Sequence, residues 1–234
     1  HNAENGIFVS TELNGDFTKA QLNVSADIKN SSVNDIMSGT DNGDYKIRHT
    51  VIDAGGREIT NSGDKPWNGD CMAQGTVTSQ CNQMTVDNPH LWSVSTPYIY
   101  ILRTELLHNG KVIDSKDTKF GIRKVEFDAD RGLLLNGKRL KIKGVNMHQD
   151  HAGVGAGMSD ALLVYRIKKL KEFGCNAYRS SHNPMTPAML DVCDSLGILV
   201  IDENRLAGIN DYHIGQLRDM IVRDRNHPSV ILWS

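Results

Sequence analysis

Two stretches decide the fold of the C-terminal half, KIKGVNMHQDH at 141–151 and NAYRSSHNP at 176–184. Each begins as a short apolar strand and ends in a polar loop that carries histidine. A helical pattern follows each stretch, and short apolar strands that alternate with helices are typical of parallel βα units. The C-terminal half is therefore predicted to form a parallel sheet with helices packed against it.

The first two helices have clear start and stop signals. Ser159 can cap a helix that Gly174 can end in a left-handed conformation. A second helix is expected between a Thr186 cap, with Pro187 in the first turn, and a Gly197 stop. These signals separate the helices cleanly from the strands.

The same alternation continues to the end of the chain. The expected strands are 141–146, 176–180, 198–202 and 230–233, and the third helix is 211–225. This third helix would bury an apolar face made of Ile214, Leu217 and Ile221.

Residues 1–122 have the alternating apolar and polar pattern of strands with one buried face. The alternation is clearest over 21–29, and Asn109-Gly110 predicts a two-residue hairpin turn. Several short strands separated by turns predict an immunoglobulin-like β-sandwich. We expect that sandwich in residues 1–122 and the βα domain in residues 123–234.

Two tryptophans lie in connecting segments of the predicted sandwich. We expect 88–100, which carries Trp92, to form an edge of the sandwich. Trp67 lies in the loop 61–68, where it would either pack the loop tip or serve as an exposed ligand platform.

Charge and cysteine content exclude several classes of partner. A net charge of −2 offers no basic face for nucleic acid, and no apolar run approaches the ~20 residues that span a membrane. The four cysteines have no zinc-binding spacing. Cys71 and Cys81 would either form a disulfide across a hairpin or remain free thiols.

Polar side chains lie at or just after the end of each of the first three strands of the βα domain. In parallel βα architecture the active site forms at these carboxyl ends. Many of these residues carry uncharged hydrogen-bonding groups and none belongs to a glycine-rich phosphate loop, which suits a polyhydroxylated ligand such as a sugar. The residues are Asn146, His148, Asp150, His151, Arg179, His182, Asp202 and Glu203.

Other roles for these residues remain open. His148 and His151 could bind a metal, but their spacing fixes no coordination geometry, and we expect none. His182 would be either a ligand contact or a histidine satisfied by the backbone. Asp202 and Glu203 should point to opposite faces of their strand, so they cannot act as an acid/base pair on one bond. We expect one of them to hold an arginine.

Five motifs in order resemble glycoside hydrolase family 2, the family of β-galactosidases, β-glucuronidases and β-mannosidases. The resemblance implies an immunoglobulin-like sandwich followed by a (β/α)8 TIM barrel, of which this chain would contain the first half. It also implies retaining hydrolysis of a β-glycoside by two glutamates about 5 Å apart. The motifs are FGIRKVEF at 120–127, LLLNGKRLKIKGVNMHQDH at 133–151, NAYRSSHNP at 176–184, CDSLGILVIDE at 193–203 and RDRNHPSVILWS at 223–234.

The resemblance assigns roles to five residues. His148 and His182 would contact the sugar, Arg179 would orient the nucleophile carboxylate, and Asn146 and Asp202 would complete or support the sugar site. Both catalytic glutamates are expected after the last residue, the acid/base directly following the terminal WS. The chain by itself is therefore expected to be inactive.

Family resemblance also bears on substrate, cofactor and location. GVNMHQDH and SHNP favour a β-galactosidase, whereas CDSLGILVIDE equally suits a β-glucuronidase. Some β-galactosidases have a magnesium-binding Glu-x-His after strand three, but NRLAGIN follows Glu203 here, so no cofactor is expected. The family implies a periplasmic or secreted protein.

The half barrel bears on assembly, and the sandwich on an alternative function. The open apolar sheet edges of the half barrel predict a homo-oligomer. An alternative from another class is a non-catalytic carbohydrate-binding or interaction module built from the sandwich.

Overall fold

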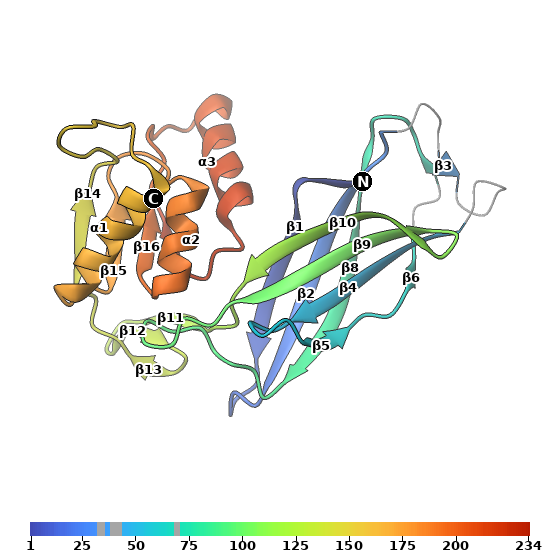
Figure 1. Ribbon diagram of the computed structural model, residues 1–234, viewed down its shortest axis with the longest axis horizontal. Helices are drawn as coiled ribbons and strands as arrows, with labels where there is room; N and C mark the ends of the chain where they lie inside the picture. Colours follow the sequence, from blue (N-terminus) through green and yellow to red (C-terminus); the bar gives the residue numbers. More distant parts are fainter. Residues whose placement is uncertain (32–35, 38–43, 68–70) are drawn as a thin grey trace. The chain divides into compact units, whose positions relative to one another are not determined.

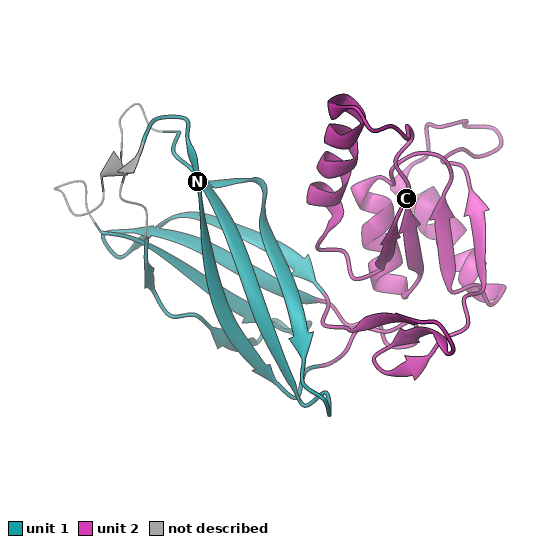
Figure 2. Cartoon of the chain, turned by 180° about the vertical axis from the view of Figure 1, so that it is seen from behind, with its two compact units in different colours: residues 1–89, 100–120 teal, residues 90–99, 121–234 magenta. Residues whose placement is uncertain are grey.

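The computed structural model describes residues 1–31, 36–37, 44–67 and 71–234. The chain divides into two compact units (Figure 2). Unit 1 comprises His1–Pro89 and Tyr100–Phe120, and unit 2 comprises His90–Ile99 and Gly121–Ser234. No helix among the described residues is long and apolar enough to cross a membrane.

Unit 1 contains two main antiparallel sheets (Figure 1). The first has the order β1 (Asn2–Leu13), β2 (Lys19–Lys29), β8 (Val77–Asp87). The second has the order β10 (Lys111–Phe120), β9 (Tyr100–His108), β4 (Tyr45–Ile52), β5 (Glu58–Asn61), with β6 (Lys65–Pro66) also paired to β4. A short pair, β3 (Ile36–Met37) and β7 (Cys71–Met72), completes the described strands of this unit.

The predicted strand pattern of unit 1 is confirmed. Leu22, Val24, Ala26 and Ile28 of β2 are all buried, with partly exposed residues between them. Asn109 and the glycine after it have φ values of 50° and 74°, as the predicted hairpin turn requires.

His49 on β4 forms a buried polar link across the sandwich. Its Nδ1 lies 3.0 Å from Thr104 Oγ1 on β9, and its Nε2 lies 3.2 Å from Asn82 Nδ2 on β8, in the opposite sheet. If the amide donates to Nε2, the ring is neutral and donates from Nδ1. Burial lowers the pKa of His49 to about 4, because charging the ring would require an ion in the sandwich core.

Unit 2 is built on a four-stranded parallel sheet (Figure 1). Its order is β14 (Gly144–Met147), β15 (Ala177–Ser180), β16 (Leu199–Asp202), β17 (Val230–Trp233). The connections contain α1 (Asp160–Glu172), α2 (Pro187–Leu196) and α3 (Asp211–Asp224). This is the predicted alternation of strands and helices.

The predicted helix caps are confirmed. Ser159 accepts a hydrogen bond from the Leu162 backbone N–H, and Thr186 accepts one from the Met189 N–H. Gly197 ends α2 with φ 69°. One helix face was predicted wrongly, because Ile214 is 52% exposed and the buried apolar residue of α3 is Met220.

A hydrophobic core lies between α1, α2 and one face of the parallel sheet. The helices contribute aliphatic and sulfur-bearing side chains, and the strands contribute residues that point toward the helices. Its buried members are Leu163, Ile167, Tyr178, Met185, Met189, Leu190, Cys193, Ile198, Val200 and Val230.

A second core lies around Trp92 and a small antiparallel sheet. That sheet contains β11 (Val125–Asp128), β12 (Gly132–Leu135) and β13 (Lys138–Arg139). Trp92 is completely buried with Leu133, Leu135, Ala177 and Leu199, and its Nε1 donates to the Asp194 carbonyl at 2.9 Å. The expectation that Trp92 forms a sandwich edge was wrong, because the indole finds its apolar partners in unit 2.

Other predictions from the sequence have mixed outcomes. Trp67 is partly buried, and its backbone N–H bonds to the Tyr45 carbonyl, while the neighbouring Asn68 lies outside the described residues. Cys81 is a free thiol, so the disulfide alternative is wrong. Among the described strands, β14 and β17 each pair on one side only, and the homo-oligomer stays a prediction.

Helix α3 ends at a buried carboxylate, Asp224, that lies beside Asp202 at the end of β16. Arg223 donates to both carboxylate oxygens of Asp224, from Nε at 2.8 Å and from Nη2 at 2.7 Å. Asp224 and Asp202 are both completely buried. Burial raises the pKa of Asp202 to about 6, and the neighbouring Asp224 carboxylate adds to this rise. The hydrogen bond that Asp202 accepts from the Met185 N–H acts in the opposite direction.

We expect unit 1 to lose stability on acidification because of His49. Its folded pKa of about 4 lies below its unfolded value of 6.5, so its contribution is complete above pH 6.5 and is lost as the pH falls toward 4. The loss should amount to at most roughly 3 kcal/mol. Hydrogen exchange followed by mass spectrometry on β4 and β8 peptides measures it.

His49→Gln should flatten this pH dependence, since its amide can still donate to Thr104 and accept from Asn82. His108→Gln, at the partly exposed end of β9, is the matched control. An equal pH dependence in His49→Gln and the native chain would contradict this assignment.

We expect the opposite pH dependence in unit 2 because of Asp202. Its folded pKa of about 6 lies above the unfolded value of 3.8, so its contribution is present below pH 3.8 and is lost as the pH rises through 6. Asp202→Asn mimics the protonated acid and should remove up to roughly 3 kcal/mol of this dependence. Hydrogen exchange of β16 and α3 peptides between pH 4.5 and 7.5 measures this pH dependence of local stability.

Asp219 is an exposed residue on α3, and Asp219→Asn is the control. If Asp202→Asn retains the native slope of stability against pH, the buried carboxylate pair is not its source.

Candidate active site

The carboxyl ends of β14, β15 and β16 meet at one edge of the parallel sheet. Asn146 pairs in register with Arg179, and Arg179 pairs with Ile201. The loops after β14 and β15 then place His148 and His182 together, with ring centroids 5.5 Å apart in an edge-to-face arrangement. The residues predicted at separate strand ends therefore form one cluster.

Glu203, directly after β16, is the centre of this cluster. Its Oε1 lies 2.7 Å from His182 Nδ1, and its Oε2 lies 2.6 Å from Arg179 Nε. The Arg179 contact is an ion pair rather than a well-aligned hydrogen bond. Burial alone would raise the pKa of Glu203, but these two partners outweigh burial and lower it.

Asp202 lies behind this cluster. Its Oδ1 accepts from the Met185 N–H at 3.0 Å and from Ser180 Oγ at 3.3 Å. Ser180 Oγ in turn accepts from the Glu203 N–H at 2.9 Å. Asp202 is completely buried, and its contacts support the loop at Met185 directly and Glu203 through Ser180.

Side chains from neighbouring loops hold the cluster in place. Gln149 Nε2 donates to the carbonyls of Asn183 and Pro184, at 3.3 and 2.6 Å, and so joins the loops after β14 and β15. Arg205 Nη1 donates to Asn183 Oδ1 at 2.9 Å and joins the loop after β16 to the same segment. From α1, Arg166 donates to the His148 carbonyl at 3.2 Å.

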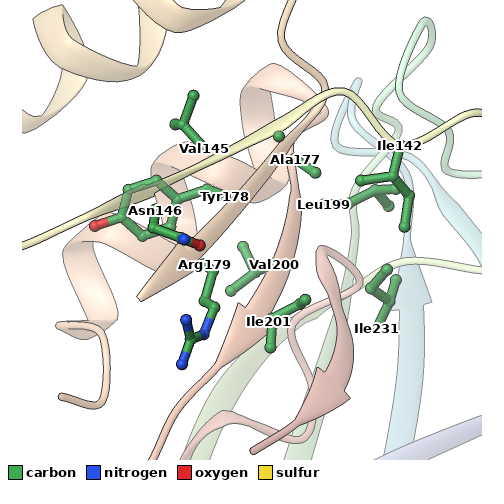
Figure 3. A pocket seen from close by; sticks show the side chains of 11 residues that line it. Ile142, Val145, Asn146, Ala177, Tyr178, Arg179, Leu199, Val200, Ile201 and Ile231 are labelled. Carbon is green, nitrogen blue, oxygen red and sulfur yellow. The ribbon is translucent and has the colours of Figure 1, made fainter. Parts of the chain in front are cut away.

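A cavity of about 330 Å³ lies along the sheet face that carries Asn146 and Arg179 (Figure 3). These two side chains supply hydrogen-bonding groups on neighbouring strands. The rest of the lining is mainly apolar, and it includes Ile142, Val145, Ala177, Leu199, Ile201 and Ile231.

One group of possible metal ligands lies elsewhere in unit 2. Oxygen or nitrogen atoms of Asp191, Asp194 and His227 lie within 4.8 Å of one another. Both Asp194 oxygens already accept hydrogen bonds, from the Ser229 N–H at 3.0 Å and from His227 Nδ1 at 2.5 Å. This group joins α2 to the segment before β17. The absence of a metal cofactor stays a prediction.

The cluster offers hydrogen-bonding groups of the kind that suit a polyhydroxylated ligand. The side chains of His182 and Arg179 are 57% and 36% exposed, and His148 is exposed beside them. Imidazole, guanidinium and amide groups together offer donors and acceptors to hydroxyl groups. Glu203, with 10% of its side chain exposed and both oxygens engaged, is unsuited to donate a proton.

Sequence reasoning located these residues but missed some connections. An arginine partner was expected for Asp202 or Glu203, and the partner is Arg179 at Glu203. The hydrogen bond from His182 to the same carboxylate was not expected. Alternation along β16 separates Asp202 from Glu203, but no local pattern shows that the loop after β15 brings His182 back to it.

Family models match most of the chain. The model described as glycosyl hydrolases family 2 matches residues 5–123, and the model described as glycosyl hydrolases family 2, TIM barrel domain, matches residues 126–212. A β-galactosidase of Bacteroides ovatus, BoGH2A, is 36% identical over 98% of this chain and 27% of its own length. A putative β-glucuronidase of Formosa agariphila is 37% identical over 65% of this chain and 16% of its own.

Solved structures give the same assignment. A family 2 member from Bacteroides cellulosilyticus superposes with TM-score 0.84 at 31% identity, covering 100% of this chain and 31% of that one. A β-glucuronidase from Bacteroides uniformis gives TM-score 0.83 at 28% identity, covering 97% and 27%. The chain spans less than a third of each relative, and the parallel sheet of unit 2 corresponds to part of a TIM barrel. By these matches and this fold, the chain belongs to glycoside hydrolase family 2.

Proposed function

We propose that this chain supplies the sugar-binding side of the active site of a retaining β-galactosidase. The observation that carries the proposal is the convergence of His148, His182 and Arg179 at the carboxyl ends of parallel strands. In a TIM barrel this edge is where substrates bind. Family membership supports hydrolysis of a glycosidic bond as the reaction.

Each residue has a role that its geometry supports. His148 and His182 face solvent together and would hydrogen-bond hydroxyl groups of the galactosyl unit. Arg179 would orient the nucleophilic carboxylate with the donors that Glu203 does not engage. Asn146 lies beside Arg179 and would bind or support the same sugar, with Asp202 as support beneath.

Retaining hydrolysis needs two further carboxyl groups, about 5 Å apart. One protonates the leaving oxygen and the other forms the covalent glycosyl intermediate. Glu203 is buried and committed to Arg179 and His182, so it suits neither role. We propose that both groups come from polypeptide that follows residue 234, and that this chain alone does not turn over substrate.

A β-galactoside is supported as substrate by the BoGH2A match across nearly the whole chain. One observation favours a β-glucuronide as second candidate. Arg205, at the same strand ends, donates to the neutral amide of Asn183, and a guanidinium so placed could meet a sugar carboxylate. The relatives that match include putative β-glucuronidases.

We expect the longer gene product that contains this chain to hydrolyse 4-nitrophenyl β-D-galactopyranoside, and the 234-residue chain alone to release no nitrophenol. Both proteins should be assayed with the matching β-D-glucuronide in parallel. Turnover by the 234-residue chain, or a longer protein that is active on neither substrate, would overturn the proposal.

His148→Ala and His182→Ala in the longer protein should each lower kcat by about 10- to 100-fold with a smaller change in KM. Contacts that strengthen in the transition state affect kcat in this way. His108→Ala, in unit 1, is the control. An effect confined to KM would show that the histidines bind the ground state and the transition state equally.

The alternative of a non-catalytic carbohydrate-binding module leads to a different expectation. Calorimetric titration of the 234-residue chain with galactose and galacto-oligosaccharides tests it. Binding heat that persists in the His148→Ala, His182→Ala double variant would place the sugar site elsewhere. It would favour the non-catalytic reading.

A further inference from the structure

We propose that Glu203 is a positioning residue that sets two sugar-site groups at once, the imidazole of His182 and the guanidinium of Arg179. The inference rests on the proposed function, because it assigns those two groups to substrate and nucleophile. Its physical basis is one carboxylate shared between residues of the neighbouring strand and its loop.

The contacts use the inner atoms of both partners. Glu203 Oε1 meets His182 at Nδ1, and Oε2 meets Arg179 at Nε. The outer atoms, Nε2 of the imidazole and the two Nη groups of the guanidinium, are not used by Glu203. The glutamate side chain is 10% exposed, whereas those of His182 and Arg179 are 57% and 36% exposed. Glu203 therefore directs both groups outward while it stays buried.

The contact with His182 selects one tautomer. A carboxylate only accepts hydrogen bonds, so the neutral imidazole must carry its proton on Nδ1 to satisfy Oε1. Nε2 then has a lone pair and can accept from a sugar hydroxyl. Without the carboxylate, the proton would be free to move to Nε2, which would turn the acceptor into a donor.

The contact with Arg179 holds the Nε side of the guanidinium beside the carboxylate by charge. An ion pair at Nε leaves four N–H donors on the two Nη atoms, arranged as a fork that matches a second carboxylate. In the proposed enzyme that carboxylate is the nucleophile. Glu203 would also offset the positive charge of Arg179 before the nucleophile is in place.

Glu203 is itself held on its backbone side. Its N–H donates to Ser180 Oγ at 2.9 Å, and Ser180 in turn donates to the buried carboxylate of Asp202 at 3.3 Å. The main chain at Glu203 therefore has little freedom to move. A rigid support of this kind is what precise placement of a binding group needs.

The test begins with the native 234-residue chain and needs no substrate. Long-range ¹⁵N–¹H correlation spectra at a pH where histidine is neutral report which ring nitrogen of His182 carries the proton. His182→Gln, at an exposed ring, assigns the signal. We expect the Nδ1–H tautomer in the native chain, and finding Nε2–H there would overturn the proposal without any Glu203 variant.

Glu203→Gln then tests the shared carboxylate. The amide keeps an acceptor oxygen at only one of the two positions, places an NH2 donor at the other and carries no charge, so we expect the His182 tautomer, the Arg179 Nε–H resonance or both to change. Arg179→Lys assigns the second signal. Glu172→Gln, which removes the carboxylate of an exposed ion pair with Lys169, is the matched control and should change neither. Unchanged signals in Glu203→Gln would overturn the inference.

In the longer protein, Glu203→Gln should lower kcat on the order of 10- to 100-fold, with a much smaller change in KM, as expected for misplaced groups. Glu203→Asp should restore part of kcat, since it keeps the charge. A shifted tautomer with native kcat would overturn the positioning role. An inactive native longer protein with the expected tautomer would instead count against the proposed function.

Discussion

The four strands β14, β15, β16 and β17 pair in parallel, so all their carboxyl ends lie at one edge of the sheet of unit 2. The candidate site depends on the register of this pairing. Asn146 lies beside Arg179, and the next residues along each strand turn into the loops that carry His148 and His182. A one-residue slip would exchange the two faces of a strand and turn Arg179 toward the helix-side core. Two separate cores, one against the helices and one around Trp92, hold the register.

Buried ionisable groups in the two units respond to pH in opposite directions. His49 is held neutral in the sandwich, so a fall in pH lowers the stability of unit 1. A protonated Asp202 is favoured beside Asp224, so the same fall in pH raises the stability of unit 2. Both transitions fall between about pH 4 and 6.5. A single melting curve would mix them, and for that reason local exchange is the suitable observable. The same Asp202 carboxylate supports Ser180 and, through it, Glu203.

Local signals in the sequence predicted most of the fold. Caps at Ser159 and Thr186, and a left-handed stop at Gly197, are interactions within one turn of helix, so they could be identified without tertiary information. Trp92 was misplaced because its buried partners, from Leu133 to Leu199, lie 41 to 107 residues away in sequence. The exposed face of α3 was misassigned because periodicity reports amphipathicity and not which elements are present to cover it.

The candidate site was also predicted in part, with its residues foreseen and their contacts missed. Position at the end of a parallel strand was enough to make Arg179, His182 and Glu203 candidates, since the architecture fixes where strand ends meet, and the family resemblance supplied the roles of Arg179 and His182. The choice of partner within that cluster depends on loop paths and rotamers, which no spacing encodes. A carboxylate that joins a loop histidine to a strand arginine is visible only in three dimensions.

The most direct test is a crystal structure of the proposed longer protein with a galactose-configured ligand trapped in its active site. The account predicts sugar hydroxyls within hydrogen-bonding distance of His148 and of His182 Nε2, with Glu203 still in contact with His182 Nδ1 and Arg179 Nε. A sugar bound away from these strand ends, or a His182 ring turned away from Glu203 in the complex, would contradict it.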